Sequence, residues 1–303
     1  MNNTHKLEGL VIPCITPFTD DLSEVDFEKF DKLVDYLIEE QCADAIIPIG
    51  TTGESTSLSH LEKELVIERA VKRANKRVPI FIGAGGANLA ETISLSEYAE
   101  NIGADGLLIV VPYYIRPDQE GIYQFFKAVA QRTNLPIMIY NIPSRTAVNM
   151  SIDTIMKIAN IDNVIGIKDC FNDITNTSEM IRICRNELKK EFSILTGEDT
   201  NIFINLCLGG NGAVAATGHV VGKKIKEMIN KYKAGDIKGA RGIQFDICTL
   251  QKYMFKAPNP APIKAALDIL GLNLGGKVRL PLVDINDDFK KLIKSELCKF
   301  YDF

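Results

Sequence analysis

Eight short apolar runs, each followed by a segment with helical periodicity, constrain the fold of this 303-residue chain more than any other feature. The runs are apolar without interruption and rich in β-branched residues, which is typical of parallel strands buried on both faces. Their first residues lie about 20 to 35 positions apart, the length of one strand, one helix and two loops. The predicted strands are Leu10–Ile15, Ala45–Ile49, Pro79–Ile82, Gly106–Val111, Ile137–Tyr140, Val164–Lys168, Phe192–Leu195 and Ala213–Ala216.

The segments between these runs place an apolar residue at every third or fourth position, the period of an amphipathic helix. One such stripe starts after Asp26, and Ser59 with Glu62 forms a capping-box pattern at the start of another. Past residue 222 the strand pattern stops and the chain reads as helical. The other predicted helices are Glu91–Asn101, Gln119–Arg132, Ile152–Ala159, Thr177–Leu188, Lys223–Lys233, Asp236–Phe255 and Pro262–Leu270.

This alternation predicts an α/β fold, a (β/α)8 or TIM barrel over residues 1–222, followed by a C-terminal helical extension over 223–303. The alternative is a doubly wound open sheet. That fold usually carries a glycine-rich turn after its first strand, whereas here the first strand runs into Thr16-Pro17-Phe18.

The composition excludes several classes of protein. Hydrophobic residues make up 46% and charged residues 24% of the chain, which is the composition of an ordinary soluble, core-forming protein. The 35 basic residues are scattered among 39 acidic ones, so we expect neither a nucleic-acid partner nor an anionic membrane surface. No apolar run approaches the ~20 residues of a membrane span, and the N-terminal segment lacks the features of a signal peptide.

Cysteine and histidine usage argues against metal and disulfide sites. The seven cysteines are far apart and no C-x-x-C occurs, so neither a disulfide framework nor a zinc ribbon is expected. The three histidines, His5, His60 and His219, are well separated, and we expect no metal site. A reduced, cytoplasmic protein is the simplest interpretation.

The segments that follow the predicted strands carry reactive side chains. In a TIM barrel such groups gather at the carboxyl ends of the strands. The second strand runs into Gly50–Ser55, the fourth into Pro112-Tyr113-Tyr114, the fifth into Tyr140–Arg145 and the seventh into Gly197-Glu198-Asp199. Together with Lys168 at the end of the sixth strand, these residues should meet at one rim.

Lys168 is the sharpest candidate for chemistry. Strand alternation puts Val164, Gly166 and Lys168 on one face, and in the barrel interior Gly166 would leave room beneath the lysine. Burial lowers the pKa of an amine, and a neutral amine can form a Schiff base with a ketone. The alternative is a strand-end lysine that extends its ammonium into solvent.

Tyr140 and the Gly50–Gly53 turn are candidates for proton transfer and carboxylate binding. Tyr140 ends the strand next to that of Lys168, at the ~4.8 Å spacing of adjacent strands. Its hydroxyl can therefore pass protons during imine formation. Alternatively, the Tyr140 ring only caps the core. The backbone N–H groups of Gly50-Thr51-Thr52-Gly53 can bind a carboxylate. Gly209-Gly210-Asn211-Gly212 precedes the eighth strand at the opposite rim and is interpreted as a tight turn.

These residues resemble the dihydrodipicolinate synthase family of pyruvate-dependent class I aldolases, a superfamily that includes N-acetylneuraminate lyase. The resemblance rests on Gly50–Ser55, Pro112–Tyr114, Tyr140–Thr146 and Ile165–Asp169, and it covers nearly the whole chain. It implies that pyruvate, held as a Schiff base of Lys168, condenses with L-aspartate 4-semialdehyde in lysine and diaminopimelate biosynthesis. No cofactor beyond that covalent Schiff base is implied.

The resemblance also implies roles for side chains around Lys168. Tyr140, Thr52 and Tyr114 would form a proton relay, with Tyr114 reaching into the site of a neighbouring subunit. The family is usually a homotetramer built as a dimer of dimers, so the implied assembly is a homotetramer.

Substrate binding is implied in the same way. Thr51 and Thr52, with backbone near Val214, would hold the pyruvate carboxylate. Arg145 would bind the carboxylate of the semialdehyde, a task that suits a planar guanidinium. Sialic acid lyases typically lack this arginine, so Ser144-Arg145 favours the synthase, and another pyruvate-dependent aldolase such as N-acetylneuraminate lyase is the alternative.

Lysine inhibits many bacterial relatives at a site on the dimer interface. Four residues of this chain are compatible with such an allosteric site: Ser55, His60, Glu91 and Tyr113. Lys63 and Ala87 depart from the lysine-sensitive pattern, and a second cation near bound lysine is unfavourable. We therefore expect weak or absent inhibition by lysine.

Two other classes of function fit less well. A barrel that only binds or regulates would be expected to lack one or more of Lys168, Tyr140 and Thr52, and all three are present. A phosphate-handling isomerase would need a phosphate site after the seventh and eighth strands, where Gly197-Glu198-Asp199 has the wrong charge.

Overall fold

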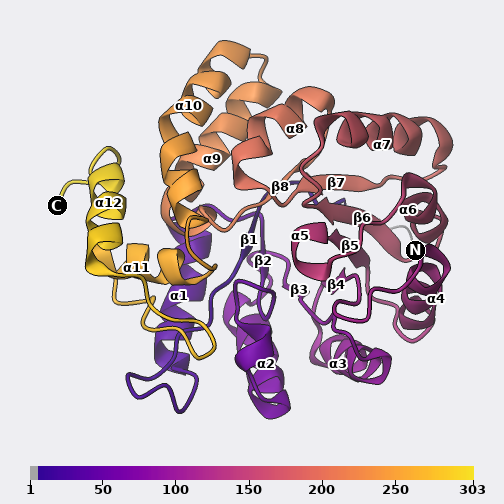
Figure 1. Ribbon diagram of the computed structural model, residues 1–303, viewed down its shortest axis with the longest axis horizontal. Coiled ribbons are helices and arrows are strands. Elements are labelled where there is room, and N and C mark those ends of the chain that lie inside the picture. The colour runs from indigo at the N-terminus through magenta and orange to yellow at the C-terminus, as the bar shows by residue number, and fades with distance from the viewer. Residues whose placement is uncertain (1–5) are drawn as a thin grey trace.

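A computed structural model describes residues 6–303, which form a (β/α)8 barrel with helices outside a central ring of strands (Figure 1). The parallel strands pair in the order β2-β1-β8-β7-β6-β5-β4-β3, and an isolated bridge between Ile46 and Ile80 joins the two ends of this order. The ring confirms the barrel over the doubly wound sheet. The strands are β1 (Gly9–Pro13), β2 (Ala45–Ile47), β3 (Phe81–Ile82), β4 (Gly106–Val110), β5 (Ile137–Asn141), β6 (Val164–Asp169), β7 (Ser193–Thr196) and β8 (Gly212–Val214).

Helices follow the strands and begin where the sequence supplies caps. The Asp26 side chain accepts a hydrogen bond from the N–H of Lys29, and Ser59 with Glu62 forms the predicted capping box. The barrel helices are α1 (Phe27–Glu39), α2 (His60–Ala74), α3 (Leu89–Ile102), α4 (Gln119–Ala130), α6 (Ile152–Ala159), α7 (Ile174–Glu187), α8 (Ile202–Leu208) and α9 (Gly218–Lys233). The short elements are α5 (Pro143–Thr146) and the 3-10 turns η1 (Ser55–Ser57) and η2 (Asp199–Asn201).

The α6 helix (Ile152–Ala159) has the predicted bounds, and most other predicted helices differ from the observed ones by a few residues at the ends. Besides the single-turn α5, two helices were not predicted. The α8 sequence is an almost continuous apolar run with no polar face to reveal a helical period. The other is α12 (Asp287–Leu297), which begins after the Asn286 cap and buries Ile293 and Leu297, four residues apart. The cap and this spacing are the helix signals that the sequence offers here.

The C-terminal extension packs beside α9 as α10 (Ile237–Met254), α11 (Ala261–Ile269) and α12 (Figure 1). The boundary expected at residue 222 lies within α9, next to Val221, whose backbone is not helical. The division into 1–222 and 223–303 therefore stays a proposal. Residues 1–5, which include His5 and the start of the segment considered for a signal peptide, lie outside the described residues.

Two layers of buried side chains hold the barrel together. One fills the space between strands and helices, and the other fills the ring itself. The strand residues of the inner layer are Val11, Ala45, Ile47, Phe81, Leu108, Met138, Tyr140, Leu195 and Val214. Because Tyr140 and Val214 end this layer, the space above them is the mouth of the barrel.

An irregularity in β6 changes which of its residues point inward. Ile137 pairs with Val164 but Met138 pairs with Gly166, so Ile165 is an extra residue. Val164 consequently lies in the outer layer, and the prediction that it shares a face with Gly166 and Lys168 is wrong. A Cβ at Gly166 would lie 2.5 Å from the Ser193 carbonyl oxygen, so this glycine admits β7 rather than leaving room beneath the lysine.

Among residues 6–303, no helix is both long and apolar enough to cross a membrane. The same residues contain no group of three or more His, Cys, Asp or Glu side chains placed to hold a metal ion. All seven cysteines have free thiols.

His219 joins α9 to the end of β1 and makes stability depend on pH. Its Nε2 accepts a hydrogen bond from the Ile15 N–H at 3.3 Å, and its Nδ1 lies 2.8 Å from the Ala216 carbonyl oxygen. The ring is fully buried, and burial lowers the pKa of His219 from 6.5 to about 4. The unfolded chain therefore binds the proton first, and stability is present above pH 6.5 and lost as pH falls toward 4.

We predict that His219→Gln abolishes this acid-sensitive part of stability. From pH 7 to pH 4 the wild type should lose on the order of 3 kcal/mol through this histidine, so the stability difference between the two proteins shrinks in acid. Urea unfolding at several pH values measures it. A difference that stays constant with pH would contradict the prediction.

Candidate active site

Lys168 and Tyr140 meet at the mouth of the barrel. They are direct partners in the β5–β6 register, and the Lys168 Nζ lies 4.1 Å from the centroid of the Tyr140 ring. Lys168 is 6% exposed and Tyr140 is 5% exposed. The structure therefore buries the amine against an aromatic face instead of extending it into solvent.

The charge state of Lys168 depends on more than burial. Burial lowers the pKa of Lys168, but the interactions of the amine with Tyr140, Cys170 and Asp199 outweigh this effect, so the pKa is raised. The expected lowering of the Lys168 pKa was based on burial alone, and the direction of the net shift is the opposite. A cation 4.1 Å above an aromatic ring is also stabilised by the ring electrons.

The neighbours of Lys168 do not all carry charge at neutral pH. Burial raises the pKa of the Tyr140 phenol and raises the pKa of the Cys170 thiol to about 12, so both are neutral there. Burial raises the pKa of Asp199 to about 6, which leaves its carboxylate largely ionised at pH 7. Asp199 is therefore the anion that supports the Lys168 ammonium under ordinary conditions.

A cavity of about 130 Å³ opens above these side chains. An apolar cavity of ~150 Å³ holds benzene, so this one has room for a molecule of similar size. It is lined by Pro13, Thr51, Thr52, Tyr140, Ile142, Ser144, Arg145, Lys168, Cys170, Gly197, Glu198, Asp199, Val214, Ala216, Phe255 and Asn259. The structure thus brings together the expected site residues with the exception of Tyr114.

The Thr51–Thr52 turn is held by backbone bonds and by one distant side chain. The N–H of Gly53 donates to the Gly50 carbonyl at 3.1 Å, and the Thr52 hydroxyl accepts a hydrogen bond of 2.9 Å from the Asn259 Nδ2. Asn259 belongs to the C-terminal extension and lies 207 residues from Thr52. Sequence reasoning missed it, because no local pattern links the two positions.

The absence of a side chain at Gly197 leaves space for the stem of the Lys168 side chain. A Cβ at Gly197 would lie 2.6 Å from the Lys168 Cε, closer than side chains tolerate, and it would also collide with the Cys170 Sγ. In the sequence, Gly197 stands out only as part of an acidic segment. The structure shows that a side chain here would displace the lysine stem.

Two carboxylates form one wall of the cavity. Asp199 is 2% exposed, and its Oδ2 accepts hydrogen bonds from the Thr217 N–H at 2.7 Å and the Thr217 hydroxyl at 2.6 Å. Glu198 is half-buried, and burial raises its pKa. The Gln251 Nε2, from α10, donates to the Asp199 carbonyl at 2.8 Å and ties this wall to the extension.

Arg145 stands where this cavity meets a second one of about 270 Å³. It is exposed on α5 and can reach a ligand in either space. Tyr114 lines neither cavity of its own chain; it is 91% exposed with φ +72°.

Only two of the four residues considered for lysine binding line either of these two cavities. Ser55 and Tyr113 line the second cavity, whereas His60 and Glu91 do not and lie at the starts of α2 and α3. The His60 Nε2 is 3.3 Å from the Glu64 carboxylate.

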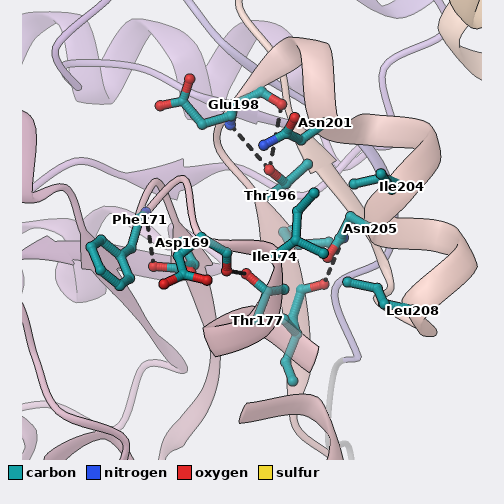
Figure 2. A pocket seen from close by; sticks show the side chains of 13 residues that line it. Asp169, Phe171, Ile174, Thr177, Thr196, Glu198, Asn201, Ile204, Asn205 and Leu208 are labelled. Carbon is teal, nitrogen blue, oxygen red and sulfur yellow. Dashed lines mark hydrogen bonds between the residues drawn. The ribbon is translucent and has the colours of Figure 1, made fainter. Parts of the chain in front are cut away.

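A smaller pocket lies between the β6–α7 and β7–α8 connections (Figure 2). The Asp169 carboxylate accepts hydrogen bonds from the Asn141 Nδ2 at 2.9 Å and the Phe171 N–H at 3.2 Å. Ile174 and Ile204 stand on its apolar side and are 47% and 39% exposed. Neither Lys168 nor Tyr140 lines this pocket, although Glu198 lines both it and the active-site cavity.

Comparison with known proteins gives consistent relatives along the whole chain. Residues 6–299 match the model of the dihydrodipicolinate synthetase family. The 4-hydroxy-tetrahydrodipicolinate synthase of Bacillus velezensis is 40% identical over 281 residues, which is 93% of this chain and 95% of that protein.

Solved structures agree with this. A dihydrodipicolinate synthase of Bacillus anthracis superposes with a TM-score of 0.92 at 35% identity, covering 97% of this chain and 99% of that chain. Another, described as a monomeric dihydrodipicolinate synthase variant, has a TM-score of 0.92 at 33% identity, covering 97% of this chain and 96% of that chain.

We predict that Gly197→Ala prevents Lys168 from forming an imine with a small 2-keto acid while the fold persists, because the added methyl displaces the lysine stem. Borohydride trapping with mass mapping measures the imine, and circular dichroism measures the fold. Gly242→Ala is the matched control, since a Cβ there meets nothing within 4 Å. Normal trapping in Gly197→Ala would contradict the prediction.

Proposed function

Because the chain belongs to the dihydrodipicolinate synthetase family, we propose that it is a 4-hydroxy-tetrahydrodipicolinate synthase, a carbon–carbon lyase of the class I aldolase type. It condenses pyruvate with L-aspartate 4-semialdehyde and serves lysine and diaminopimelate biosynthesis. The observation that carries the proposal is the buried Lys168 amine over Tyr140, in a cavity that also contains the Thr51–Thr52 turn.

The first step forms an imine between Lys168 and pyruvate. The amine loses its proton, attacks C2 of pyruvate, and the carbinolamine then loses water to give a protonated imine. The Tyr140 ring lies 4.1 Å from Nζ, and its hydroxyl can transfer protons to and from the departing oxygen. Thr51, Thr52 and backbone near Val214 hold the carboxylate, and no added cofactor is needed.

The second step makes the new carbon–carbon bond. The imine loses a proton from C3 to become an enamine, whose carbon attacks the aldehyde of the semialdehyde. Arg145 at the edge of the cavity pairs with the carboxylate of this second substrate. The amine of the semialdehyde then attacks the imine carbon, which closes the ring and releases Lys168.

We place this chemistry in a cytoplasmic homotetramer, built as a dimer of dimers. Two exposed apolar surfaces support association. One is formed by Tyr114, Ile115, Leu280 and Val283, which are 91%, 64%, 78% and 68% exposed. The chain neighbours of these residues, Tyr113, Pro281 and Leu282, line the same second cavity. The other contains Ile174 and Ile204 beside the pocket of Figure 2. In such an assembly Tyr114 would enter the site of a neighbouring subunit and complete the relay with Tyr140 and Thr52.

The alternative is another pyruvate-dependent aldolase that uses the same Lys168 imine with a different acceptor. Arg145 favours an acceptor that carries a carboxylate. Weak or absent inhibition by lysine stays a prediction for this chain. Ser55, His60, Glu91 and Tyr113 are compatible with a lysine site, whereas Lys63 and Ala87 depart from the lysine-sensitive pattern.

Pyruvate trapping tests the proposal. Incubation with pyruvate and borohydride should add one reduced pyruvate imine to the peptide that contains Lys168, because this amine is buried in the cavity. Peptide mass spectrometry locates the adduct. No adduct, or an adduct on another lysine, would exclude the mechanism.

We predict that Arg145→Ala lowers kcat/KM for the semialdehyde about 10- to 100-fold, the value of a hydrogen bond to a charged group. Pyruvate trapping on Lys168 should be unchanged, since Arg145 acts on the second substrate. Arg182→Ala, which removes an exposed arginine on α7, is the control. Equal activity with N-acetylmannosamine in place of the semialdehyde would instead favour the lyase.

A further inference from the structure

A fully buried ion pair lies just outside the active-site cavity. The Lys264 Nζ is 2.6 Å from the Glu54 Oε1, and the two side chains are 1% and 0% exposed. Glu54 follows the Thr51–Thr52 turn, and Lys264 lies on α11 of the C-terminal extension. Removing two charges from water costs free energy. No step of the proposed reaction uses either group, so the pair needs another explanation.

Both members of the pair have further partners in the extension. The Lys264 Nζ donates to the Lys277 carbonyl at 2.8 Å and lies 4.3 Å from the centroid of the Phe18 ring. The Glu54 Oε2 accepts a hydrogen bond of 3.0 Å from the Arg279 N–H. The Glu54 carboxylate is therefore fixed to two separate segments of the extension.

The backbone at Glu54 needs such support. Its φ of 52° and ψ of 38° lie in the left-handed region, which a residue with a side chain rarely adopts. Strained residues of this kind persist only where the surrounding structure holds them. Glu54 lies two residues after Thr52, so a change in its backbone would move the turn.

A second contact from the extension reaches the turn itself. The Asn259 Nδ2 donates to the Thr52 hydroxyl at 2.9 Å, and Asn259 lies five residues before Lys264. One short stretch of the extension thus holds Thr52 by its side chain and Glu54 by its charge.

We infer that Glu54 and Lys264 are positioning residues, which together with Asn259 fix the Thr51–Thr52 turn in the geometry that binds the pyruvate carboxylate. Neither charged group touches the substrate. The C-terminal extension is accordingly part of the machinery for pyruvate recognition, and this inference rests on the proposed function of the site.

The test measures pyruvate binding apart from turnover. Borohydride trapping on Lys168 is titrated with pyruvate in the wild type, Glu54→Gln, Lys264→Met and the double variant, and unfolding temperatures are recorded. The half-saturating pyruvate concentration should rise about tenfold to a hundredfold in all three variants, while the adduct yield at saturation is retained. Lys299→Met is the control, because it removes a Lys–Glu pair of the same 2.6 Å length at the end of α12.

The double variant keeps the test decisive if single variants fail to fold. It leaves no unpaired buried charge, and such replacements of similar volume are often neutral for stability. Asn259→Ala, which disturbs no charge, should shift half-saturation in the same direction. Wild-type half-saturation in the folded double variant and in Asn259→Ala would overturn the inference, since a purely structural pair would change only the unfolding temperature. Absence of any adduct in the wild type would instead refute the proposed function.

Discussion

The register between β5 and β6 is the constraint on which the site depends. It sets Tyr140 opposite Lys168 and turns both side chains into the barrel mouth. A slip of one residue would move Lys168 to the outer face, because strand side chains alternate. The extra residue at Ile165 comes before this pair, so it changes the orientation of Val164 and leaves the alignment at the mouth intact.

The strands were predictable because a strand that is buried on both faces is a continuous run of apolar residues, which is visible in the local sequence. Each predicted strand overlaps an observed one, and their ends differ because neighbouring strands decide where pairing stops. The extra residue in β6 was not predictable in this way, since nothing in Val164–Gly166 distinguishes it from regular alternation. The α8 helix was missed for a related reason: its period is hidden in an apolar run.

The site residues form two groups: those that the barrel topology alone brings together, and those that it does not. Lys168, Tyr140 and Thr52 stand at or just after strand ends, so the fold class was enough to group them. Asn259 and Lys264 come from the extension and act across more than 200 residues of sequence. Their contribution depends on how α11 packs near the second strand, which periodicity does not specify.

The raised pKa of Lys168 is consistent with imine chemistry when the intermediate is considered. An apolar pocket would favour the neutral amine but would then oppose the protonated imine, which carries positive charge at the same nitrogen. The Tyr140 ring face and the Asp199 carboxylate stabilise a cation at that position in both states. The ammonium must therefore lose a proton before the amine attacks pyruvate. The same surroundings then stabilise the protonated imine, whose positive charge makes the loss of a proton from C3 easier. Stabilising the cation thus favours the protonated imine, although the amine must first be deprotonated.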